Sequence, residues 1–145
     1  MSRTSSLSNG GLFIANKSAI AAATANIFTI SSGDAFSPAV EIIGIIGIVA
    51  STIQSQTNNT KLVHSLQSDL CAVLDINGDA TGTQFTTTGV TTDALINSGL
   101  SGMPAAKQIL FNGTISMNCS ASSSGTISWK VIYRKLQPDA TIVAA

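Results

Sequence analysis

Residues 107–134 decide the fold, because they hold two runs of alternating apolar and polar residues. In the first, KQILFNGTISMNC at 107–119, the odd positions from Ile109 onward are apolar apart from Gly113, and Leu110 is the apolar residue out of phase. In the second, ISWKVIYR at 127–134, the alternation resumes from Ile127 to Tyr133. Side chains of a strand point alternately to its two faces, so each run predicts a strand with one buried face. The Ser/Gly-rich segment 120–125 between them predicts a hairpin turn.

This alternation also predicts which side chains are buried. We expect the inner faces of these two adjacent strands to be formed by Ile109, Phe111, Ile115, Met117, Ile127, Trp129, Val131 and Tyr133.

The rest of the chain indicates further short strands and no long helix. The apolar run 39–54 predicts the central strand, and Gly44 and Gly47 within it indicate a bulge or a close backbone contact. Shorter strands are expected at 26–31, 61–66, 70–76, 83–88 and 141–144, while 18–26 suits a helical turn or a loop equally well. The sequence therefore predicts an all-β, single-domain β-sandwich of the jelly-roll kind with about eight strands.

The domain is expected to span residues 15–145 and to follow an extended N-terminal arm at residues 1–14. Residues 1–11 are small and polar, whereas Leu12, Phe13 and Ile14 form an apolar anchor that could dock outside the domain. The alternative is a first strand of the same domain preceded by a frayed tail.

Composition excludes several classes of partner. Seven basic and seven acidic residues cancel in 145 residues, and without a run of Lys or Arg the chain has no field that would attract nucleic acid.

The apolar run 42–50 is too short to span a membrane. Asn16 and Lys17 interrupt the apolar N-terminal residues, so no secretory signal is expected. Low charge, with Ser and Thr making up about a quarter of the chain, favours a protein embedded in an assembly.

Candidate chemistry is sparse, and we expect no enzyme, no catalytic residue, no cofactor and no metal site. His64 is the only histidine, and it suits a half-buried position on a strand beside Leu62 and Leu66. Residues 75–79 space oxygen ligands as a calcium loop begins, but Ala80 and Thr86 stand where glycine and glutamate are required. A hairpin turn is favoured there, and weak divalent binding by Asp75 and Asp79 stays open.

The two cysteines are the remaining candidates. Cys71 and Cys119 are expected to be free thiols in apolar strands, although a single disulfide between them stays open.

Two stretches resemble small structural proteins encoded in the virion-morphogenesis regions of tailed bacteriophages. They are DLCAVLDINGDATGTQFTTTG at 69–89 and GTISMNCSASSSGTISWKVIYRKLQPDATIVAA at 113–145. The resemblance covers somewhat under half of the chain and departs at Lys135, Gln137 and Pro138, where the group has an arginine–proline–leucine segment and a glycine.

The resemblance implies a capsid decoration (cement) protein that binds the outer surface of the major capsid lattice, commonly as a homotrimer. Its partners would be the major capsid protein and further copies of itself, and its location the outside of the virion. A phage tail or fibre subunit, or a carbohydrate-binding β-sandwich module, is the alternative. The residues expected to contact partners are Leu12, Phe13, Ile14, Lys130 and Arg134.

Overall fold

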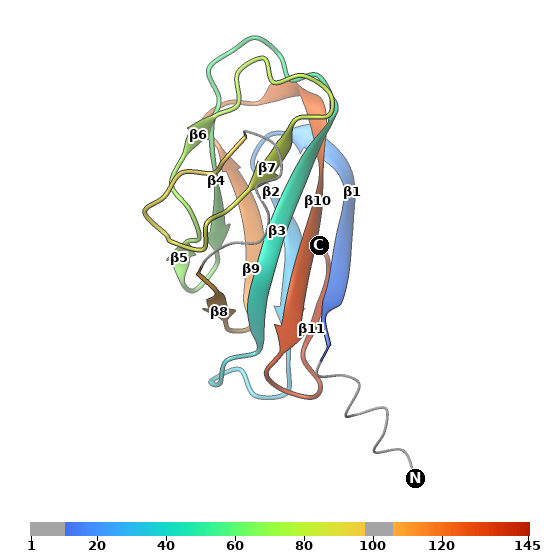
Figure 1. Cartoon of the computed structure of the whole chain (residues 1–145), viewed down its shortest axis with the longest axis vertical. Helices are drawn as coiled ribbons and strands as arrows, with labels where there is room; N and C mark the ends of the chain where they lie inside the picture. Colours follow the sequence, from blue (N-terminus) through green and yellow to red (C-terminus); the bar gives the residue numbers. More distant parts are fainter. Residues whose placement is uncertain (1–10, 98–105) are drawn as a thin grey trace.

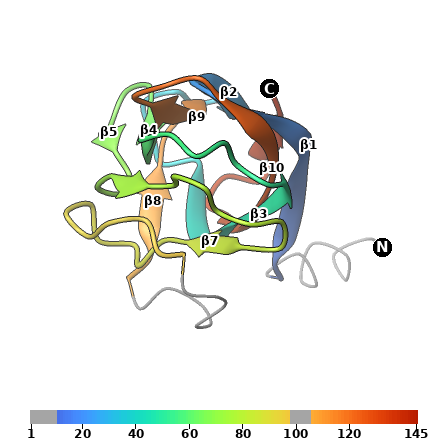
Figure 2. The ribbon, with the colours of Figure 1, turned by 90° about the horizontal axis from the view of Figure 1, so that it is seen from above.

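Two antiparallel sheets packed face to face make up the protein (Figures 1 and 2). The computed structural model describes residues 11–97 and 106–145, in which strands are joined by turns and loops and no helix occurs. The front sheet contains β1 (Phe13–Ala22), β10 (Ser123–Lys135), β3 (Val40–Ser51), β7 (Gln84–Thr86) and β8 (Gln108–Leu110). The back sheet contains β11 (Thr141–Ala144), β2 (Ala25–Ser31), β9 (Gly113–Cys119), β4 (Asn59–His64), β5 (Ser68–Asp69) and β6 (Leu74–Asp75).

The order of the strands is that of a jelly roll. Across the front sheet it is β1, β10, β3 and then β7 and β8, which both pair with β3; across the back sheet it is β11, β2, β9, β4 and then β5 and β6. Each long strand therefore crosses to the opposite sheet from the one before it, and β11 adds an edge strand beside β2. The predicted all-β sandwich is confirmed, with eleven strands in place of about eight.

The predicted hairpin between the two alternating runs is wrong. β9 pairs with β2 and β4 in the back sheet, whereas β10 pairs with β1 and β3 in the front sheet. Ile115 and Met117 therefore face Ile127 and Trp129 across the sandwich instead of lying beside them. The alternation assigned these buried faces correctly, but a period of two specifies a face and not the neighbouring strand.

The first run also contains a break that shifts its phase. Residues 111 and 112 separate β8 from β9, and the chain changes sheets there at Gly113, whose φ is 153°. Leu110, expected to be out of phase, is buried with 2% of its surface exposed, whereas Ile109 is 49% exposed and points outward. Phe111 is only partly buried. The prediction of inner-face residues is therefore wrong for Ile109.

β3 is a central strand, as predicted, and its glycines have the expected roles. The register with β10 shifts between Gly44 and Ile42, which is a bulge. A Cβ on Gly47 would lie 2.7 Å from Cζ3 of Trp129, so only glycine lets the indole ring lie against this strand. The ring also stacks on Phe85, with centroids 6.3 Å apart, at the centre of the core.

The structure differs from the expected strand boundaries in two further regions and from the expected start of the domain. Residues 18–22 continue β1 instead of forming a helical turn or loop, and residues 70–76 hold only the two-residue strand β6. The proposed boundary between arm and domain at residue 14 falls inside β1, because Phe13 and Ile14 already pair with Tyr133 and Ile132. Residues 1–10 of the predicted arm lie outside the described residues.

Candidate functional site

The outer face of the front sheet carries a group of isoleucines that the core does not use. Trp129 and Val131 point into the core, so their neighbours on β10 point outward, and the strand register places outward residues of β1 and β3 beside them. Ile132 lies next to Ile14 in this way. We call the exposed and half-buried group the isoleucine face; it comprises Ile14, Ile46, Ile48, Ile109 and Ile132.

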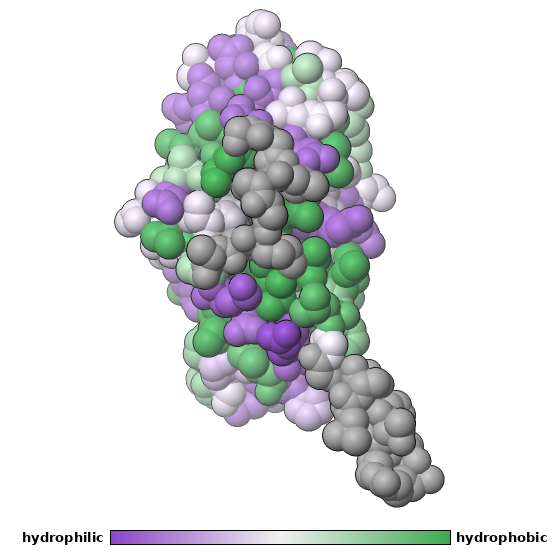
Figure 3. Space-filling view, viewed as in Figure 1, coloured by the Kyte–Doolittle hydropathy of each residue, from purple (hydrophilic) through white to green (hydrophobic). Residues whose placement is uncertain are grey.

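The isoleucine face exposes apolar side chains on the surface of the front sheet. Ile14 is 57% exposed and Ile48 is 38% exposed, although both lie in regular strands. Figure 3 shows hydrophobic residues gathered over β3, β10 and β1, with hydrophilic residues among and around them. Apolar patches of this kind on a sheet face commonly mark a surface that a partner covers.

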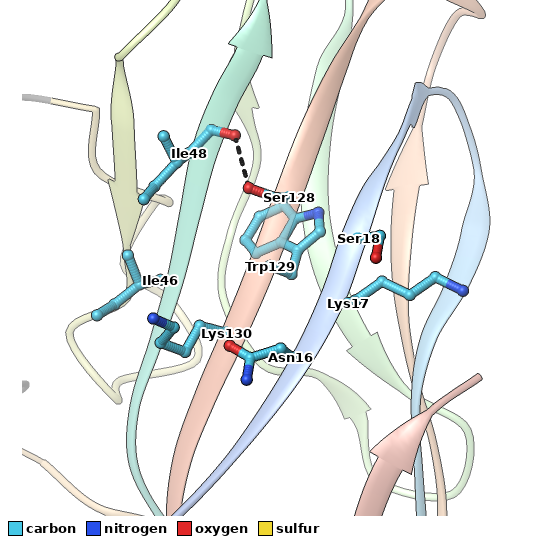
Figure 4. A pocket seen from close by; sticks show the side chains of 8 residues that line it. All are labelled: Asn16, Lys17, Ser18, Ile46, Ile48, Ser128, Trp129 and Lys130. Atoms are coloured by element: carbon cyan, nitrogen blue, oxygen red, sulfur yellow. Dashed lines mark hydrogen bonds between the residues drawn. The ribbon is translucent and has the colours of Figure 1, made fainter.

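A hollow of about 260 Å³ lies in this face between β1, β10 and β3 (Figure 4). Its lining combines the apolar Ile46 and Ile48 with polar groups from the other two strands. The lining residues from β1 and β10 are Asn16, Lys17, Ser18, Ser128, Trp129 and Lys130, of which Lys17 and Trp129 are register partners that point toward the core. The register of β1 and β10 shifts between Lys17 and Ile20, so the two strands pair irregularly beside the hollow.

The charges around the isoleucine face are mostly paired. Arg134 and Glu41 are register partners and form an ion pair with 2.7 Å between Nη1 and Oε1. The Nζ of Lys17 donates a hydrogen bond to the backbone oxygen of Ala145. Lys135 lies over the ring of Phe13, with its Nζ 4.4 Å from the ring centroid. Lys130 is exposed and forms no ion pair or hydrogen bond within residues 11–97 and 106–145.

The five residues predicted to contact partners are thus only partly brought together. Ile14, Lys130 and Arg134 lie on the outer face of the front sheet. Phe13 points inward and stacks on Tyr133, with ring centroids 5.7 Å apart, and Leu12 is exposed just before β1. Sequence reasoning missed Ile46 and Ile48, because a continuous apolar run such as β3 is typical of a strand buried on both faces.

The edges of the front sheet are less accessible to a partner than this face. The side-chain amide of Gln67 donates from Nε2 to the backbone oxygen of Ile109 at 3.0 Å and accepts from the Phe111 N–H at 2.8 Å. It therefore occupies backbone groups that a further strand would need beside β8. On β1, Lys17 is the register partner of the inward-pointing Trp129, and an inward charge on an edge strand opposes strand addition.

His64 lies on β4 of the back sheet, and both of its ring nitrogens take part in hydrogen bonds. It is buried, its Nε2 lies 2.9 Å from the backbone oxygen of Phe111, and its Nδ1 accepts from the N–H groups of Leu66 and Gln67 at 3.1 and 3.2 Å. This pattern requires a neutral ring with its proton on Nε2. Burial lowers the pKa of His64, against a smaller opposing effect of the hydrogen bond to Phe111. Leu66, expected on the same face, lies exposed in the turn.

The other candidate groups have structural partners as well. Both cysteines are free thiols, as predicted, and burial raises the pKa of each. Asp75 accepts hydrogen bonds at Oδ1 from the N–H groups of Asn58 and Asn77, which fixes the turn. Within the described part of the chain, no three His, Cys, Asp or Glu side chains gather as a metal site would require. In the same residues no helix is long and apolar enough to cross a membrane.

Comparisons with known proteins identified no similar protein, so the resemblance to phage proteins depends only on the two stretches of sequence quoted above. A scan against models of protein families gave no match, and searches of curated proteins and of solved structures gave none either.

Proposed function

We propose that the protein is a structural component of a tailed-bacteriophage particle, and most specifically a decoration protein on the outer capsid surface. Two stretches of sequence, 69–89 and 113–145, support the phage class through their resemblance. The single observation that carries a docking role is the isoleucine face, which exposes apolar side chains on a regular sheet. Under this proposal the isoleucine face contacts the major capsid protein or a further copy of the chain.

The free energy of burying apolar side chains favours docking of a partner on the isoleucine face. Full burial of one isoleucine side chain stabilises a complex by about 1.5–3 kcal/mol, so a few half-exposed isoleucines supply a substantial share of a binding free energy. The isoleucines lie on strands that pair on both sides or pair with β10 or β3 on one side, so the sheet holds them in place. A rigid face loses little conformational entropy on docking, which further favours binding.

The proposal includes no catalytic role. His64 supplies its two ring nitrogens to backbone groups, and the thiols of Cys71 and Cys119 have raised pKa values that disfavour the reactive thiolate. These are the side chains on which a hydrolase or transferase in this chain would depend first.

We further propose that the protein acts as a homotrimer. The net charge of zero removes long-range repulsion between copies, and closed cyclic symmetry prevents unlimited polymerisation. Light scattering over a dilution series measures the oligomeric state directly. A monomer at every concentration, and on the particle as well, would contradict the trimer.

Particle composition tests the proposal as a whole. Quantitative mass spectrometry of purified virions should find hundreds of copies, and cryo-electron microscopy should place the sandwich on the capsid lattice with the isoleucine face covered. A few copies located on the tail would favour the tail or fibre alternative. Absence from the particle, combined with binding to a glycan array, would replace the proposal with a carbohydrate-binding role.

A further inference from the structure

Lys130 stands out among the cations of the front sheet, because it has no counter-charge among residues 11–97 and 106–145. It lies at the centre of the isoleucine face, between its register partners Asn16 on β1 and Ile46 on β3. Arg134 has Glu41, and Lys17 has the backbone oxygen of Ala145. Since the Arg134–Glu41 pair is neutral as a whole, Lys130 gives the middle of this face its positive charge.

A partner that covers the isoleucine face must also cover this ammonium group. A cation that loses its hydration in an interface opposes binding unless an acceptor, preferably a charged one, replaces the water. The described part of the chain holds no carboxylate in the hollow, because none of the residues that line it is acidic. The partner must therefore supply the counter-charge.

The rest of the hollow also favours an acceptor. The ring of Trp129 lies beneath the hollow on the core side of the sheet, where its Nε1 is buried without a hydrogen-bond partner among the described residues. Figure 4 shows this nitrogen on the β1 side of the ring, and Asn16 and Ser18 line the hollow from that strand. The hollow thus combines an unpaired cation with the side-chain amide of Asn16 and the hydroxyl of Ser18, and its volume of about 260 Å³ admits the end of one side chain.

We propose that the hollow between β1, β10 and β3 receives an acidic side chain, aspartate or glutamate, from the protein surface on which the isoleucine face docks. The carboxylate lies against Lys130, and the isoleucines around it exclude water. This inference rests on the proposed docking function and names the chemistry of the partner at one point of the interface.

Binding to particles that lack the protein provides the first test. Lys130→Met removes the charge and keeps an apolar stem, so it should weaken binding about thirtyfold or more, because the partner's carboxylate is left buried without a counter-charge. Lys130→Arg should bind within a few-fold of the wild type. The matched control is Thr57→Glu, which shifts the net charge by the same single unit at an exposed loop residue outside the hollow. It should leave binding unchanged.

A carboxylate probe on the isolated protein provides the second test and does not depend on any particle. Trp129 is the only tryptophan, so its indole N–H gives a single NMR signal beside the hollow. N-acetylglutamate amide should shift this signal saturably at millimolar concentration, N-acetylglutamine amide should not, and Lys130→Met should abolish the shift.

The two tests separate failure of the inference from failure of the proposed function. If the wild type binds particles and Lys130→Met binds equally well, the inference is overturned and the docking function stands. If no particle binds the protein but the carboxylate shift depends on Lys130, the hollow is supported and the phage function fails. If the carboxylate probe gives no shift, or if Lys130 instead binds nucleic acid, the inference is overturned.

Discussion

The outer faces of the two sheets differ in whether their polar side chains form hydrogen bonds and ion pairs with one another. On the back sheet, neighbouring strands pair their polar side chains: Ser116 donates to Asn26 at 2.7 Å, and Lys61 and Asp69 form an ion pair at 2.9 Å. On the front sheet, the outer face presents isoleucines around Lys130, which has no such partner in the part of the chain that the structure describes. These polar groups of the back face therefore pair with each other, whereas the front face exposes apolar side chains and one charge that the described residues leave unpaired.

The largest loss of folding stability is expected for a change in the core between the two sheets. Trp129→Ala should lower the free energy of unfolding by about 3–5 kcal/mol, because the indole ring fills the space between Gly47 and Phe85. Urea denaturation measures this loss. Ile48→Ala on the outer face is the control and should cost much less. A similar cost for both variants would show that the isoleucine face contributes to folding as much as the core does.

His64 holds the segment between β8 and β9 against β4, so it tests how much this crossing between the sheets contributes to stability. His64→Ala leaves the backbone oxygen of Phe111 without its ring partner and should cost about 1–3 kcal/mol of stability. Particle binding by the folded variant should be unchanged. Loss of binding at unchanged stability would show a direct functional role for the imidazole.

The same residue predicts a pH dependence with a definite sign. Burial lowers the pKa of His64 in the folded protein, so the unfolded chain binds a proton more readily. Its stabilising contribution is therefore complete above the ordinary histidine pKa of about 6.5 and falls as the pH drops below that value. Asp79, whose pKa burial raises, acts in the opposite direction. Chemical denaturation at pH 7.5 and pH 5.5, with His64→Ala for comparison, isolates the histidine contribution.

The isoleucine face itself is tested by changes that keep strand propensity. Ile14→Thr combined with Ile48→Thr should change stability by less than about 1 kcal/mol, because both side chains are exposed in the monomer. Binding to particles or to further copies should weaken about tenfold or more, since apolar area buried in the complex is lost. The control is Val143→Thr, an exposed position on β11 of the back sheet. Equal losses for both faces would remove the distinction between them.

How far sequence alone leads is clear from the two alternating runs. Alternation identified the buried faces of Ile115, Met117, Ile127 and Trp129, because burial on one face of a strand imposes a period of two. It could not identify the neighbouring strand, since a facing strand of the opposite sheet produces the same pattern as a hairpin partner. The sequence also did not reveal the phase shift at Ile109. It arises because the chain passes from the front sheet to the back sheet at Gly113.

The candidate site was harder to predict than the fold, for a physical reason. Lys130 and Ile14 were identified from their own surroundings in the sequence, but Ile46 and Ile48 lie in an apolar run that looks buried throughout. Their exposure follows from the order of the strands, because β3 has an open outer face in the front sheet. A long-range arrangement of this kind leaves no local signal in the sequence.

The smallest effect is expected on the back face, where polar pairs satisfy each other in water. Ser116→Ala removes the 2.7 Å hydrogen bond to Asn26, which lies between register partners of β9 and β2. An exposed bond of this type contributes only about 0.5 kcal/mol, because water replaces the lost partner. The melting temperature should fall slightly, and particle binding should match the wild type. Reduced binding with an unchanged melting temperature would place a contact surface on the back sheet, and the assignment of docking to the isoleucine face would then have to be reversed.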